Sequence, residues 1–280
     1  MIRQKAVEVF YLCFFTAYFC GMILQNTSEL GYIPKRIISL VPSQTELLYY
    51  LGLENETIGL TKFCIHPEEW FRAKTRVGGT KTIKADIVNS LQPDLIIANK
   101  EENIKEQVEI LAEEYPVWVT DVNNLEDALQ MINDIGELTG KTAQALQLNE
   151  SIRKEFTELA KHTLQNPITK TAYLIWQNPY MTVGGDTFIN DMLLQCGFQN
   201  VFADEKRYPE ITVSELQNSG SQLILLSSEP YPFKQKHINE LATSLPDCKI
   251  ILVDSEYFSW YGSRLLFAPR YFKKLMNSII

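Results

Sequence analysis

Short apolar runs alternate with amphipathic segments from residue 36 onward. Four runs have the length and the β-branched content of buried strands, at residues 37–41, 57–61, 95–98 and 117–120. Apolar positions three and four residues apart predict helices over residues 83–91, 103–114 and 124–138. Because strands separated by helices form parallel sheets, we expect this half of the chain to be a Rossmann-like lobe.

The first strand is followed by a sequence typical of a helix start. Ser43 and Glu46, three residues apart, have the spacing of a capping box, and Gly52 is placed to end the same helix. We therefore expect Ser43 to be the N-cap residue.

The second half repeats the alternation. Strands are predicted at residues 172–176, 223–227 and 250–253, and helices at residues 186–196, 213–218, 234–244 and 265–279. Between the halves, residues 142–164 contain no Gly or Pro and would form a helix roughly 33 Å long. The predicted fold is α/β, with mostly parallel sheets in two lobes, residues 34–141 and 170–280, joined by one spine helix over residues 142–165.

Two internal echoes support a pair of related lobes. Residues 95–101 and 223–229 are each an apolar run followed by polar residues and a carboxylate, Glu101 in one and Glu229 in the other. Residues 36–53 and 171–198 share a strand, a Pro-containing turn and a helix that ends near a glycine. The echoes predict a cleft between two lobes, and a surface on which Glu101 and Glu229 lie side by side, both exposed.

The composition is that of a soluble globular protein, with 45% hydrophobic and 21% charged residues. Acidic residues number 34 against 26 basic ones, for a net charge of −8. Nucleic acid binding requires a basic surface, and no basic run indicates one. We expect a monomer.

The first 30 residues stand apart from the lobes. Arg3 and Lys5 precede a mostly apolar stretch, residues 7–24, which resembles a secretory signal or an uncleaved anchor despite Glu8 within it. This predicts a periplasmic or membrane-anchored protein of the cell envelope. If Met22 is the true start, no export signal remains and the protein is cytoplasmic.

Catalytic and metal-binding patterns are missing from the sequence. The five cysteines form no CxxC pair, and His66, His162 and His237 have no metal-ligand spacing. No nucleophile elbow or phosphate-binding loop is present. We therefore predict no enzyme activity, no metal site and no cofactor of the protein's own.

Loops predicted at the carboxyl ends of strands are rich in aromatic and small polar residues, and ligands of open α/β sheets bind at those ends. A pocket with Trp176, Tyr180, Trp260 and Tyr261 would suit a large, flat, partly apolar ligand, whereas the alternative for each ring is core packing. Lys81, Lys84, Arg264 and Arg270 could meet ligand carboxylates or phosphate, or be solvated. His66 could ligate the metal of a bound chelate, or it could be an N-capping histidine or one that packs against neighbouring side chains.

Several segments together resemble a known family. The segments RIISLVPSQTELLYYLG, VGGTKTI, LQPDLIIANKEEN, TAYLIWQNPYMTVGGDTFINDMLLQCGFQNVF and SWYGSRL are similar to substrate-binding proteins of ABC importers for cobalamin, haem and ferric siderophores. The resemblance extends over about residues 34–275, and the cobalamin-binding members are the most similar.

The resemblance implies a ligand site between two lobes joined by a spine helix. The residues that it places at the site are Pro42, Ser43, Gln44, Phe63, Gly79, Tyr180 and Trp260. The loop residues discussed above add His66, Trp176, Tyr261 and Arg264 to the predicted site. It also implies one acidic residue per lobe that engages arginines of the transporter's membrane subunits. Glu101 and Glu229 fill that role by the internal symmetry, with Glu102 or Glu106 as alternatives. Asn99-Lys100 stands where cobalamin binders have a tryptophan.

The sequence thus predicts a protein that binds a metal chelate, cobalamin or another corrinoid, in the interlobe cleft and delivers it to an ABC importer. Two alternatives stay open at this point. One is a cytosolic protein that handles or senses a corrinoid, and the other is an enzyme on the same scaffold.

Overall fold

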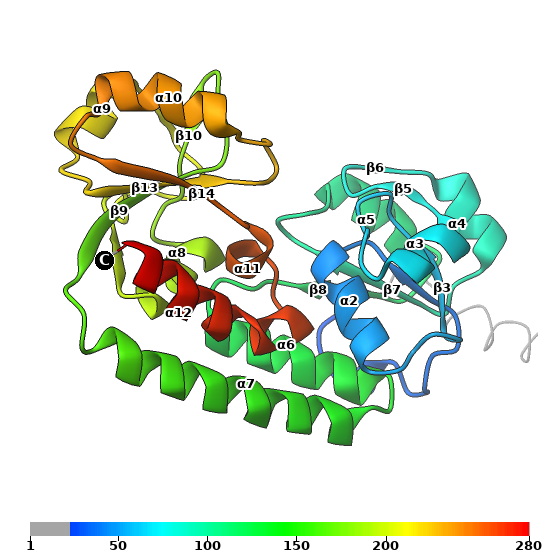
Figure 1. The fold of residues 1–280 in the computed structure, drawn as a ribbon. Helices are drawn as coiled ribbons and strands as arrows, with labels where there is room; N and C mark the ends of the chain where they lie inside the picture. The colour runs from blue at the N-terminus through cyan, green and yellow to red at the C-terminus, as the bar shows by residue number, and fades with distance from the viewer. Residues whose placement is uncertain (1–22, 280) are drawn as a thin grey trace, which may run out of the picture. The chain divides into compact units, whose positions relative to one another are not determined.

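Two separate parallel sheets organise the chain (Figure 1). The computed structural model describes residues 23–279, so the predicted signal or anchor lies mostly outside the described residues. Unit 1 contains the residues up to Asp121 together with Ile132–Ala145, and unit 2 contains Val122–Met131 and the residues from Leu146 onward. Within residues 23–279, no helix has the length and apolar character needed to cross a membrane.

Unit 1 is built on a six-stranded sheet of order β1-β8-β7-β2-β3-β4, in which every pairing is parallel. The strands are β1 (Ile23–Leu24), β2 (Ile37–Ser39), β3 (Thr57–Leu60), β4 (Thr75–Arg76), β7 (Leu95–Asn99) and β8 (Val117–Thr120). The helices are α2 (Pro42–Tyr50), α3 (Glu68–Ala73), α4 (Ala85–Leu91) and α5 (Lys105–Ala112), with a short 3-10 turn at Thr27–Glu29. An antiparallel hairpin, β5 (Gly78–Gly79) with β6 (Thr82–Ile83), follows β4.

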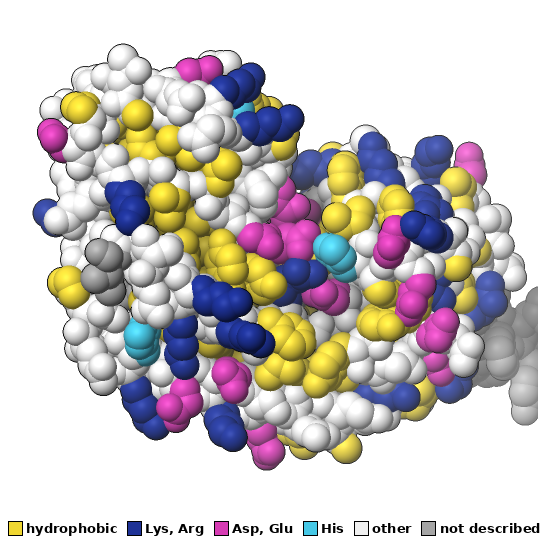
Figure 2. All heavy atoms as spheres, viewed as in Figure 1, with side chains coloured by type: hydrophobic (Ala, Val, Ile, Leu, Met, Phe, Trp, Pro, Cys, Tyr) yellow, Lys and Arg dark blue, Asp and Glu magenta, His cyan; other side chains and the backbone are white. Residues whose placement is uncertain are grey.

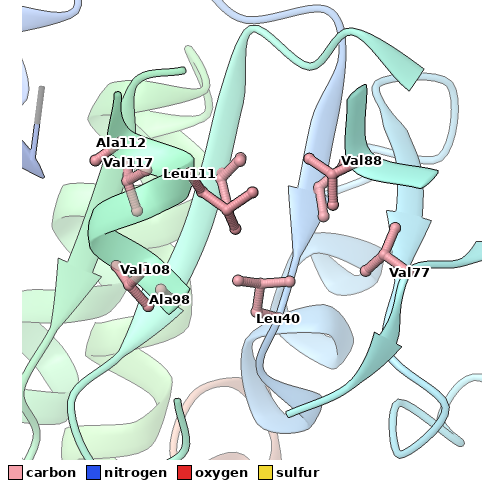
Figure 3. Close-up of a cluster of buried hydrophobic side chains, with 10 residues drawn as sticks. Leu40, Val77, Val88, Ala98, Val108, Leu111, Ala112 and Val117 are labelled. Atoms are coloured by element: carbon pink, nitrogen blue, oxygen red, sulfur yellow. The ribbon is translucent and has the colours of Figure 1, made fainter. Parts of the chain in front are cut away.

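The core of unit 1 lies between the sheet and helices α4 and α5 (Figure 3). Val88 of α4 and Leu111 of α5 are almost fully buried against side chains of the central strands, such as Ile96 and Ala98. Each buried aliphatic side chain of this kind contributes roughly 1.5–3 kcal/mol to folding. These are the apolar positions whose spacing predicted the strands and helices.

Unit 2 has a four-stranded parallel sheet of order β11-β9-β13-β14. Its strands are β9 (Thr169–Leu174), β11 (Phe198–Asn200), β13 (Leu223–Ser227) and β14 (Lys249–Val253), with an antiparallel pair of β10 (Tyr180–Met181) and β12 (Glu210–Ile211). Its helices are α8 (Phe188–Gln195), α9 (Val213–Asn218), α10 (Gln235–Ser244), α11 (Glu256–Ser259) and α12 (Ala268–Ile279), with a 3-10 turn at Ser263–Leu266. A second core forms around Leu174, Ile224, Leu226 and Leu241.

The internal echo predicted from the sequence appears in the strand orders. In unit 1, β7 lies between β2 and β8, and in unit 2 β13 lies between β9 and β14. The strands that contain the matching apolar runs, β7 and β13, thus occupy equivalent positions in their own sheets. The α/β fold with mostly parallel sheets is confirmed.

The long helix expected near residue 142 is α7 (Thr142–Thr163), but α6 (Leu125–Leu138) also passes from one unit to the other. The two helices pack against each other. A Cβ atom on Gly136 of α6 would lie 2.4 Å from Cβ of Ala145, so glycine permits the close approach. Further along, Asn149 donates to the Leu129 carbonyl at 2.7 Å, and Arg153 forms a two-bond ion pair with Glu126. The helix predicted as a single spine is therefore one arm of a helical hairpin.

Candidate ligand-binding site

The carboxyl ends of β2 and β8 in unit 1 are joined by buried polar side chains. Ser43 and Gln44 are 3% and 0% exposed, and Gln44 Nε2 donates to Thr120 Oγ1 at 2.5 Å. The prediction that Ser43 caps the helix is wrong. Val41 is the N-cap and Pro42 occupies the first helical turn, where its fixed φ angle suits the helix and its missing N–H costs nothing. Ser43 and Gln44 thus belong to the packed interior at the carboxyl end of the sheet.

The turn after β7 is held by two buried asparagines. Asn99 Oδ1 accepts from the backbone N–H groups of Glu101 and Glu102, at 2.8 and 3.2 Å. Asn103 Oδ1 accepts from Asn99 N–H, and Asn103 Nδ2 donates to the Thr80 carbonyl, both at 2.9 Å. Asn99 is therefore a turn-forming residue. Both glutamates are half-buried, so the prediction that Glu101 is exposed is wrong.

Phe63 and Gly79 lie together at the end of β3. The Phe63 ring is 50% exposed, and Lys62 Nζ is 5.0 Å from its centroid. A Cβ atom on Gly79 would lie 3.2 Å from Cε2 of Phe63, so the absence of a side chain leaves room for the ring. His66, three residues further along, is half-buried. The structure thus gives unit 1 an exposed aromatic surface at the carboxyl end of its sheet.

A hollow of about 430 Å³ adjoins that ring. It is lined by Lys62, Arg76, Gly78, Gly79, Thr82, Ile83 and Lys84. Its lining contains three cations and no carboxylate, in a chain whose net charge is −8.

In unit 2, Trp176 follows the carboxyl end of β9 and is 39% exposed. Its ring packs edge-to-face on Tyr231, with 5.5 Å between centroids. Tyr231 was not predicted as a site residue, although it lies in the Pro-rich loop after β13, a position where ligand-contacting residues are common. An exposed tryptophan supported by a tyrosine gives unit 2 its own aromatic surface.

Gln177 holds the neighbouring tyrosines in place. Its Nε2 donates to the Tyr180 hydroxyl at 3.2 Å, and its Oε1 accepts from the Tyr231 hydroxyl at 3.0 Å. Burial raises the pKa of the half-buried Tyr180 despite the hydrogen bond from Gln177. His237 is buried, and its Nδ1 accepts from the Lys234 N–H at 2.8 Å, so this ring completes the start of α10.

The remaining predicted site residues of unit 2 are packed inside it. Trp260 and Tyr261 are only 6% and 5% exposed, and Tyr261 packs edge-to-face on Phe188. Arg264 forms an ion pair of 2.6 Å with Glu256, and its guanidinium carbon lies 4.8 Å from the Trp260 ring centroid. The expectation that Trp260 and Tyr261 present exposed rings is therefore wrong, because aromatic, ionic and hydrogen-bonding neighbours within unit 2 cover them.

Glu229 belongs to the same network. Its Oε1 accepts from Trp260 Nε1 at 2.8 Å, and its backbone N–H donates to Ser255 Oγ at 3.0 Å. Burial raises the pKa of Glu229, while the Trp260 hydrogen bond opposes that shift. The prediction that Glu229 is an exposed surface carboxylate is wrong. Its position after β13, equivalent to that of Glu101 after β7, is as predicted.

Among residues 23–279, no group of three or more His, Cys, Asp or Glu side chains could hold a metal ion. Each unit has an exposed aromatic ring near the carboxyl end of its sheet, Phe63 in unit 1 and Trp176 in unit 2.

Residues 37–244, most of the chain, match the family described as periplasmic binding protein. The chain belongs to the periplasmic binding protein family. Proteins of this family are the substrate-binding components of ABC importers, and this chain is one of them.

Among known periplasmic binding proteins, a vitamin B12-binding protein of Yersinia pestis (strain Pestoides F) is 24% identical over 249 residues, which cover 88% of this chain and 87% of the relative. The solved structure of the periplasmic vitamin B12 binding protein BtuF of Vibrio cholerae has a TM-score of 0.75 at 19% identity, covering 88% of this chain and 97% of that one. The apo periplasmic heme-binding protein RhuT from Roseiflexus sp. RS-1 has a TM-score of 0.74 at 18% identity, covering 87% and 97%. At these identities the structural likeness shows the fold alone.

Proposed function

We propose that this periplasmic binding protein binds a metal chelate with a planar macrocycle, a corrinoid in the first place, and delivers it unaltered to an ABC importer. The observation that carries the proposal is the exposed aromatic ring at a carboxyl sheet end in each unit, Phe63 in unit 1 and Trp176 in unit 2. A flat, partly apolar ligand is desolvated well by such rings. Among the relatives, vitamin B12-binding proteins support the corrinoid and heme-binding proteins support a porphyrin.

The rest of the predicted site divides into two groups under this proposal. Phe63, His66 and Gly79 of unit 1 and Trp176 and Tyr180 of unit 2 contact the ligand. Pro42, Ser43, Gln44, Trp260, Tyr261 and Arg264 hold the sheet ends and loops that carry those contacts. A preformed set of loops loses little ordering free energy when the ligand binds.

Docking to the transporter is proposed to use carboxylates that follow equivalent strands. Glu101 and Glu229 are the two predicted residues, and Glu106, exposed in the first turn of α5, is an alternative in unit 1. A carboxylate suits arginine because the guanidinium fork binds it with two parallel hydrogen bonds.

Substitution of the exposed rings tests the proposal. Phe63→Ala and Trp176→Ala should each weaken chelate binding by about 1–3 kcal/mol, since each removes a large apolar contact. Tyr50→Ala is the matched control, because Tyr50 is 46% exposed at the far end of α2 and away from the carboxyl edge. Chelate recovered from the protein should be chemically intact by mass spectrometry. Wild-type affinity in both ring variants would contradict the proposed site, and an altered chelate would favour an enzyme.

A further inference from the structure

The cationic hollow of unit 1 has a defined place in the sheet. Lys62 follows the carboxyl end of β3, Arg76 ends β4, and Lys84 follows the β5–β6 hairpin. Ligands of parallel α/β sheets bind outside the carboxyl ends of the strands. The hollow therefore occupies the position where the fold places ligand contacts, beside the exposed Phe63 ring. Figure 2 shows Lys and Arg side chains around hydrophobic ones over this hairpin.

The backbone fixes the two lysines relative to each other. The Lys62 N–H donates to the Gly78 carbonyl, and the Lys84 N–H donates to the Val77 carbonyl, each at 2.8 Å. Gly78 has a φ angle of +114°, and a Cβ atom there would lie 2.2 Å from the Thr82 carbonyl oxygen. Only glycine permits this close turn of the hairpin. Both lysines are thus hydrogen-bonded through their backbones to residues 77–78, and both line the hollow.

Arg76 is also preorganised. Its guanidinium carbon lies 4.4 Å from the Phe71 ring centroid, and its Nη1 donates to the Lys74 carbonyl at 3.1 Å. Within residues 23–279, neither Lys62 nor Lys84 takes part in an ion pair. Three positive charges converge on one hollow without a compensating carboxylate in its lining, an arrangement that favours an anion.

We propose that this hollow binds an anionic substituent of the chelate, a carboxylate or a phosphate, while the macrocycle lies on Phe63. The proposal rests on the proposed function and narrows its ligand class to chelates that carry such a group. A charge-assisted hydrogen bond from lysine or arginine is about twice as strong as a neutral one, so the anionic group would dominate selectivity. A chelate without an anionic group would keep its contact with the Phe63 ring and lose the charge-assisted hydrogen bonds in the hollow.

Pairs of chelates with and without an anionic group provide the test. Haemin is compared with its dimethyl ester, which differs from it only in the two carboxylates, and cyanocobalamin, with its phosphodiester, is compared with cobinamide, which lacks the whole nucleotide loop. Wild-type protein should bind the anionic member of at least one pair roughly tenfold more tightly. Lys62→Gln with Lys84→Gln should abolish that preference, and both lysines are exposed, so folding should be retained.

A matched control separates local from general electrostatics. Lys35→Gln with Lys105→Gln changes the net charge equally at exposed positions of the same unit, outside the hollow. This variant should retain the wild-type preference. A preference that survives in the Lys62/Lys84 variant, or equal binding within both pairs by wild-type protein, would overturn the inference.

A titration with inorganic phosphate tests the anion site independently of chelate binding. Backbone amide signals of Gly78 and Gly79 in the full chain should shift in a saturable manner, and the Lys62/Lys84 variant should lose the shifts while the control variant keeps them. If no chelate binds, the proposed function fails, and this titration alone decides on the anion site. Absence of saturable shifts in wild-type protein would then overturn it.

Discussion

The indole N–H of Trp260 donates a hydrogen bond of 2.8 Å to the carboxylate of Glu229. Sequence patterns assigned the two residues separate roles, one as a ligand-contacting ring and the other as an exposed docking charge. The two side chains instead pair inside unit 2, where Arg264 stacks on the indole ring. Both residues therefore stabilise the structure of this unit. The hydrogen bond thereby links the segment that follows β13 to the segment that follows β14, at the carboxyl ends of the two strands.

Loss of that hydrogen bond should destabilise the protein. Trp260→Phe keeps an aromatic ring but leaves the Glu229 carboxylate without its indole donor. A buried acceptor that loses its partner costs roughly 1–3 kcal/mol, so the free energy of unfolding should fall by that amount in a denaturant titration. The same substitution in a Glu229→Gln background should cost less, since a neutral acceptor is less expensive to leave unpaired. Equal costs in both backgrounds would show that the pair is not coupled.

The pH dependence of stability should change when Glu229 is neutralised. Burial raises the pKa of Glu229 above its ordinary value of 4.5, so the folded state binds this proton more tightly than the unfolded state does. Its contribution to stability is therefore greatest below pH 4.5 and declines as the pH rises through the folded-state pKa. Glu229→Gln removes that decline. The unfolding free energy of the variant minus that of wild type should increase between pH 4.5 and neutrality, and a constant difference would contradict the assignment.

The continuity of α7, one arm of the helical hairpin, can be tested by substitution. Gln147 is exposed near the first third of the helix, and Gln147→Pro should remove a backbone hydrogen bond and clash with the preceding turn. The expected loss of unfolding free energy is about 3 kcal/mol or more, with Gln147→Ala as a control that should change little. Similar stability of the two variants would mean that α7 is not a continuous helix in solution.

Docking through Glu101 and Glu229 predicts a defect in transport without a defect in binding. Glu101→Arg places a like charge opposite a transporter arginine, and Glu229→Gln removes a charge while it keeps an acceptor for Trp260. The double variant should bind chelate as wild type does and should show reduced uptake at equal ligand occupancy. Undiminished uptake would move the docking role to other acids, with Glu106→Arg as the next variant to measure.

The sequence predicted the parallel sheets well because continuous apolar runs such as residues 223–227 have the length of a strand buried on both faces and sharp polar ends. It did not predict the two-residue strands β1, β4, β5, β6, β10 and β12, or the three-residue β11, since so few positions carry no recognisable alternation. The Ser43 cap failed because the helix starts at Pro42 with Val41 as its N-cap, two residues before the predicted cap. Trp260 was misjudged because local sequence does not tell whether a loop aromatic meets solvent or, as here, a carboxylate and an arginine from its own unit.

The central claim is that this periplasmic binding protein holds a planar metal chelate. Calorimetric titration of the purified wild-type protein with cyanocobalamin, cobinamide, haemin and ferric siderophores tests it most directly. The account predicts one-to-one binding of a corrinoid or of haemin with micromolar affinity or better, near −8 kcal/mol. Absence of binding to every corrinoid and to haemin would contradict the account.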